Sequence, residues 1–118
     1  MSEAMTDPTC VLRASGRRFA AKRYLATSTM LPERVEDNAF ELTVSRAAPD
    51  AHATLVNDIE RFLSAPQLDL TRLFAFPGVE HVALELRCGP QGDSALVLPA
   101  RVCTALGKHG LELVVRRA

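Results

Sequence analysis

The chain has 118 residues, and its 14 basic and 14 acidic side chains give a formal net charge of zero. This length suits one domain, and contents of 47% hydrophobic and 24% charged residues are ordinary for a globular protein. A balanced charge provides no long-range attraction to nucleic acid or anionic lipid. Apolar runs such as Ala95–Leu98 are far too short to cross a bilayer, so we expect no membrane association.

Residues 1–8 are predicted to be a flexible leader, because they carry acidic residues and lack the apolar stretch of an export signal. Residues 9–118 are predicted to form a single α+β domain. Cys10, Cys88 and Cys103 are odd in number and include no Cys-x-x-Cys pair, which argues against a disulfide framework and for a reducing compartment. The high Arg and Ala content is typical of a GC-rich bacterial genome. We therefore expect a bacterial cytoplasmic protein.

In the first half of the chain, apolar and polar residues alternate over 10–14 and 39–45, which predicts two strands. In the first strand the even-numbered residues should face inward, and in the second Ser45 should face outward. Ser15 is expected to cap a helix over residues 17–26. The segment 27–38 contains Pro32 and no sustained period, so it is predicted to be a loop.

The strongest helical pattern follows Pro49 and Asp50 and should end at Pro66, and its apolar residues are Leu55, Val56, Ile59, Phe62 and Leu63. A short helix is expected near residues 68–74, before a turn at Pro77–Gly78. A strand over 79–88 should continue through a turn at 89–93 into a hairpin partner at 94–98. A last helix should begin at Pro99, bury Val102, Cys103 and Leu106, end at Gly107 or Gly110 and lead into a strand over 111–116.

The predicted order is therefore β-α-β-α-β-β-α-β. Because most strands alternate apolar and polar residues, the sheet should have one buried face and one face in water. The fold class predicted is α+β, with a single mostly antiparallel or mixed sheet of four to five strands and helices packed on one face.

The residues that could carry chemistry do not form a recognisable site. His52, His81 and His109, with the three cysteines, lack the spacing typical of a zinc site, and the cysteines fall on faces expected to be buried. No nucleophile elbow, phosphate-binding glycine pattern or paired carboxylates are evident. We therefore predict no catalytic residues, no metal and no cofactor.

The clearest charge cluster is Arg17, Arg18, Lys22 and Arg23, which Arg116 and Arg117 could join. It could bind phosphates, but the solvated face of a short helix explains it better in a chain of zero net charge. With one Tyr and no Trp for base stacking, nucleic acid is not the expected partner. The four residues remain a candidate binding patch.

Three sequence features are similar to a loose group of small uncharacterised bacterial α+β proteins. They are Val11-Leu-Arg-Ala-Ser-Gly16, Phe74-Ala-Phe-Pro-Gly-Val79, and Leu98-Pro-Ala-Arg101 followed by Gly110-Leu-Glu-Leu113. Members of the group share a first strand ending in Ser-Gly, a long central helix and a turn before a strand. These motifs are structural, and the resemblance implies no activity.

Three functions remain open. The first is a non-enzymatic protein of immunity or accessory type that acts through protein–protein interaction. Its partner could include a second copy of itself, bound through an open sheet edge as a homodimer. The alternative is a small ligand-binding or enzymatic domain with a pocket between helix and sheet, which convergence of Arg13, Tyr24 and His81 would support. The third is nucleic-acid binding through the basic first helix.

Overall fold

A computed structural model describes residues 9–28, 31–47, 52–65, 70–88 and 97–117. The strands in these ranges are β1 (Cys10–Ser15), β2 (Arg34–Glu36), β3 (Ala39–Ser45), β4 (His81–Cys88) and β5 (Glu112–Arg117). The helices are α1 (Ala21–Ala26), α2 (His52–Leu63), α3 (Leu70–Ala75) and α4 (Ala100–His109). Among these helices, none has the length and apolar character that a membrane span needs.

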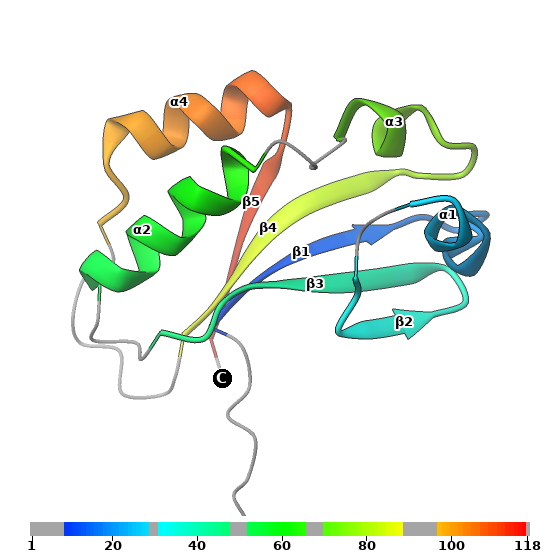
Figure 1. The fold of residues 1–118 in the computed structure, drawn as a ribbon, viewed down its shortest axis with the longest axis horizontal. Coiled ribbons are helices and arrows are strands. Elements are labelled where there is room, and N and C mark those ends of the chain that lie inside the picture. Colours follow the sequence, from blue (N-terminus) through cyan, green and yellow to red (C-terminus); the bar gives the residue numbers. More distant parts are fainter. Residues whose placement is uncertain (1–8, 29–30, 48–51, 66–69, 89–96, 118) are drawn as a thin grey trace, which may run out of the picture.

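The strands form one open sheet in the order β2-β3-β1-β4-β5 (Figure 1). Neighbouring strands are antiparallel except β4 and β5, which run parallel. A parallel pair requires a crossover connection, and α4 provides it. The predicted α+β class with a mixed sheet is confirmed.

One face of the sheet, the helix face, packs against the helices and carries the hydrophobic core. Leu12, Leu42 and Leu84 are buried on three adjacent strands, and Leu55 and Ile59 of α2 are buried in the same cluster. Figure 1 shows α2 and α4 side by side across one end of the sheet, with α1 and α3 near the other end. The expected burial of Leu55, Val56, Ile59 and Leu63 along one side of α2 is confirmed.

An aromatic cluster completes the core beside α1. The ring of Tyr24 stacks on Phe40 at a centroid distance of 5.8 Å and meets Phe76 edge-on at 5.2 Å. Phe19 contacts all three rings, and Tyr24 is fully buried. Such pairs contribute about 0.5–1.5 kcal/mol each beyond the area they bury. Tyr24 is therefore part of the core, on the opposite side of the sheet from Arg13 and His81, and the three do not form a pocket.

Strand β2 lies in the segment 27–38, which was predicted to be a loop. β2 occupies residues 34–36 and pairs with β3 across a two-residue turn. Periodicity could not find it, because all three of its residues are exposed and a three-residue strand is too short to show alternation. Of the predicted hairpin strand, Val97 and Leu98 are not in a strand, and residues 94–96 lie outside the described residues.

Two predictions about serines are wrong. Ser15 does not cap a helix, because it ends β1 and pairs with Ala39 and His81, and α1 begins only at Ala21. Ser45 faces the helices, since an irregularity near the start of β1 places it opposite Cys10. There it is buried and donates a hydrogen bond to Asp58 of α2 at 2.7 Å. A bulge of this kind changes the face on which later residues lie.

Several other expectations concern residues that the structure does not describe. They are the leader 1–8, the helix start at Pro49 and Asp50, Leu68, the turn 89–93 and the side chains of His52, Cys88 and Arg117. The helix predicted to end at Pro66 ends earlier, at Leu63, within the described residues. α4 ends at His109, and Gly110, whose left-handed φ of 71° suits glycine, caps it.

Candidate interaction surface

The face of the sheet opposite the helices, called the open face here, carries a network of glutamate and arginine side chains. Glu41 accepts hydrogen bonds from Arg13 at 2.8 Å and from Arg87 at 2.9 Å. Glu85 accepts from Arg87 at 3.1 Å and pairs with Arg116 at 3.0 Å. Burial lowers the pKa of Arg87, but its bonds to Glu85 and Glu41 outweigh this and raise it, so its charge is retained. Both carboxylates are thus neutralised by arginines, which come from β1, β4 and β5.

The predicted basic patch is divided between a turn and a helix. Arg17 and Arg18 precede α1 and line a shallow hollow of about 290 Å³, together with Gly78, Val79 and Glu80. The Glu80 carboxylate accepts a 2.7 Å hydrogen bond from the Arg17 amide, which brings a negative charge into the hollow.

The other two members of the patch, Lys22 and Arg23, lie on α1, where Lys22 is 3.9 Å from Asp37. Arg116 bonds Glu85 on the open face instead. Phosphate binding by the four residues stays a prediction.

The described side chains considered for metal binding form no cluster. Within the described ranges, no three His, Cys, Asp or Glu side chains are placed to hold a metal ion. His81 lies 3.3 Å from Glu112 on the open face, and His109 ends α4. Cys103 was expected to be buried with Val102 and Leu106, but it is exposed, because the buried side of α4 is formed by Val102 and Leu106, one helical turn apart, and Cys103 does not lie on it.

The two cysteines whose side chains are described should differ strongly in reactivity. Burial raises the pKa of the Cys10 thiol to about 12, although nearby Arg87 acts in the opposite direction. At about pH 8 we expect Cys10 of the folded protein to alkylate at least about a hundredfold more slowly than the exposed Cys103. Mass spectrometry of peptides after iodoacetamide treatment measures both rates. Unfolding in urea should make them similar, whereas equal rates in the native protein would contradict the burial of Cys10.

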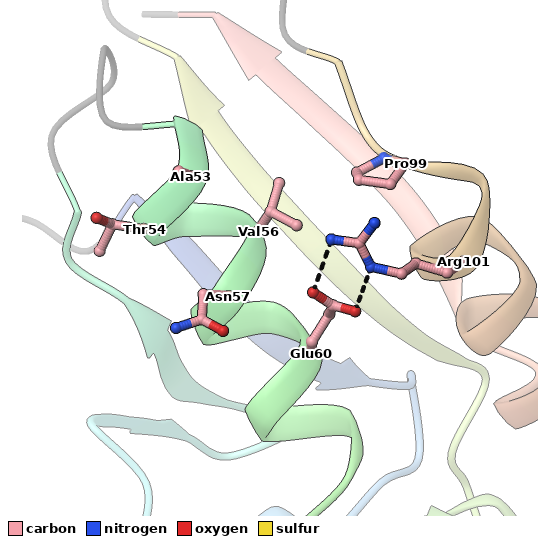
Figure 2. A pocket seen from close by; sticks show the side chains of 7 residues that line it. All are labelled: Ala53, Thr54, Val56, Asn57, Glu60, Pro99 and Arg101. Carbon is pink, nitrogen blue, oxygen red and sulfur yellow. Dashed lines mark hydrogen bonds and ion pairs between the residues drawn. The ribbon is translucent and has the colours of Figure 1, made fainter.

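A groove between α2 and the start of α4, lined by described residues, has a volume of about 600 Å³. Figure 2 shows Glu60 and Arg101 facing each other across it, with Val56 of α2 on the same side as Glu60. The Arg101 guanidinium donates to both Glu60 oxygens, at 2.6 and 3.2 Å. These bonds lower the pKa of Glu60 and raise that of Arg101. The charged groups of the groove therefore satisfy each other, and an anionic ligand would have to displace Glu60.

Strand β5 forms one edge of the sheet and presents apolar side chains to water. Among the described residues it pairs only with β4, so the backbone groups along its other side have no strand partner. Leu113 and Val115 lie on the helix face beside Leu84 and Leu86, yet they are 41% and 53% exposed. The strand order makes β5 an edge, and sequence alternation alone could not identify these two residues as exposed.

The opposite edge of the sheet is protected. β2 has three residues, of which Arg34 and Glu36 are charged and 4.0 Å apart. Short length and charge are the usual features that prevent an edge from pairing with another chain. β5 is twice as long as β2. It contains three apolar residues, Leu113, Val114 and Val115, whereas β2 contains one, Val35. Of the two edges, β5 is the better surface for adding a strand.

Comparisons with protein-family models, with curated proteins and with solved structures gave no match to this chain. The fold and the residues of the surface are therefore the basis for any function, and the resemblance to small bacterial proteins stays a prediction.

Proposed function

We propose that the protein is a binding module that recognises another polypeptide chain through the β5 edge. The observation that carries this proposal is the exposure of Leu113 and Val115 on an edge strand whose other side is unpaired among the described residues. An extended partner segment would bond to the free backbone groups, and its own alternate side chains would pack on these two residues.

The kind of role proposed is that of an immunity or accessory protein in the bacterial cytoplasm. Its support is the cysteine content, three residues with no Cys-x-x-Cys pair, and the exposed β5 edge described above. Zero net charge gives no electrostatic steering toward a strongly basic partner, such as a nuclease. Shape and strand pairing at β5 would then provide the recognition.

A small-ligand or enzymatic function is the weaker candidate. The groove between α2 and α4 has sufficient volume, but its one cationic side chain, Arg101, is already bonded to Glu60. The side chains of Arg13, Tyr24 and His81, which would have supported such a pocket, lie on different faces of the sheet. Neither hollow offers a free catalytic group.

A photo-crosslinking amino acid placed at Leu113 tests the proposal in the source cells. The matched control position is Val35 on β2, which also lies on the helix face of an edge strand and is 37% exposed. We expect a discrete protein adduct from position 113 and little from position 35, because only β5 has the length and apolar surface for strand addition. No adduct at position 113, or equal adducts at both, would refute the proposal.

A further inference from the structure

The residue sequence of β5 is self-complementary when two copies of the strand run antiparallel. Resting on the proposed function, we propose that the partner at the β5 edge is a second copy of this chain. The two sheets would join into one continuous sheet across a two-fold axis at Val114, with the helices of both copies on the same side.

The register follows from the two faces of the strand. A two-fold axis perpendicular to the sheet keeps each face continuous, so residues on the same face must lie opposite each other. With the axis at Val114, Leu113 lies opposite Val115 of the other copy, and Glu112 lies opposite Arg116. The apolar pair occurs twice on the helix face, and the charge pair occurs twice on the open face, on either side of Val114.

Other registers lose this match. A shift of the axis to Val115 places Val114 opposite Arg116, and a shift to Leu113 places Glu112 opposite Val114. Only the register centred on Val114 pairs Glu112 with Arg116 and Leu113 with Val115. Such cross-strand pairs are the main side-chain contribution to pairing in antiparallel sheets.

The charged groups concerned are accessible in the single chain. The side chains of Glu112 and Arg116 are 60% and 64% exposed while they contact His81 and Glu85, respectively. Each can therefore meet an opposite charge from a second copy without leaving its present neighbour. Strand β2 has a related pattern, with Arg34 and Glu36 on either side of Val35, but it has half the length and no second apolar residue.

Charge exchange at positions 112 and 116 tests the register with purified protein. We expect the full chain to show a monomer–dimer equilibrium in sedimentation experiments. E112R and R116E should each place like charges opposite each other twice and weaken self-association at least about tenfold. A mixture of the two variants should associate again, because both cross-strand pairs are then complementary. A monomeric wild-type chain, or variants that associate as tightly as wild type, would overturn the inference.

Because R116E also places a carboxylate near Glu85, a second variant avoids any change in charge. V114C in a C103S background should form a disulfide-linked dimer on mild oxidation, since residue 114 meets its own copy at the axis. C103S alone measures the background, and V35C in the same background is the matched edge control. A dimer linked through position 35 but not 114 would overturn the inference.

The outcomes separate this inference from the proposed function. If the crosslinker at Leu113 captures a chain of a different mass while the purified protein is monomeric, the binding function stands and self-pairing is wrong. If position 113 gives no protein adduct, both are wrong. An adduct of twice the monomer mass, together with restored association in the mixture, supports both.

Discussion

G16A is expected to unfold the protein or to lower its free energy of unfolding by at least about 3 kcal/mol. A Cβ atom on Gly16 would lie 1.9 Å from the Gly78 carbonyl oxygen and 2.9 Å from the Glu80 amide nitrogen. Both are backbone atoms, so no side-chain rotation can relieve the clash.

Hydrogen bonds also tie the segment at Gly16 to its neighbours. The Glu80 amide donates to the Ser15 carbonyl at 2.9 Å, and the Gly16 amide donates to Asn38 at 3.1 Å. Gly78 itself has a φ of 89°, a conformation that suits glycine. Separating the segments to admit a methyl group would break these bonds at the end of the central strand, β1.

The matched control is G107A, in α4. A Cβ atom there meets no atom within 4 Å, and alanine favours a helix over glycine by about 0.5–1 kcal/mol. We therefore expect G107A to stabilise the protein slightly. Urea denaturation followed by circular dichroism measures both changes. If G16A unfolds at the same urea concentration as wild type, the close approach of the two backbone segments is not present.

R87A is expected to have the second largest effect, a loss of about 2–3 kcal/mol in the free energy of unfolding. Arg87 bonds Glu41 and Glu85, whose side chains are only 8% and 5% exposed. Its removal leaves each buried carboxylate with a single arginine partner, Arg13 or Arg116. The loss should be below that of breaking a fully buried pair, because these partners remain and Arg87 is itself partly exposed.

Two controls separate bridging from charge alone. R87K keeps the charge but cannot donate to both carboxylates in the same fixed geometry, so its loss should lie between those of wild type and R87A. R34A removes an exposed partner of Glu36 on β2 and should change stability by less than about 0.5 kcal/mol. Equal losses in R87A and R34A, measured by urea denaturation, would show that the open-face network does not stabilise the fold.

The sequence predicted the elements whose residues repeat at a regular interval. The strands near residues 10–14, 39–45 and 81–88 and the helix through Leu55 and Ile59 each show a local period, which is enough to assign their type and their buried side. The glycine pattern likewise predicted the helix end at Gly107 or Gly110, and the structure places the cap at Gly110. From these local features the α+β class followed.

Features that depend on neighbouring strands could not be predicted in the same way. Val11 was assigned to the wet face, yet it is fully buried there between Thr43 and Glu85, its cross-strand neighbours. The Arg87 bridge joins residues 46 positions apart, and Ser45 turns inward because of an irregular register. Each depends on which residues pairing brings opposite each other.

The exposed β5 edge likewise combines a local feature that the sequence predicted with a long-range feature that it could not predict. The sequence by itself determined that Leu113 and Val115 share one side of a strand, because side chains alternate along any strand. Only the tertiary structure decided that this strand is an edge and that its apolar residues remain exposed. Strand order results from long-range pairing among all the strands, and the local pattern of one segment holds no information about it.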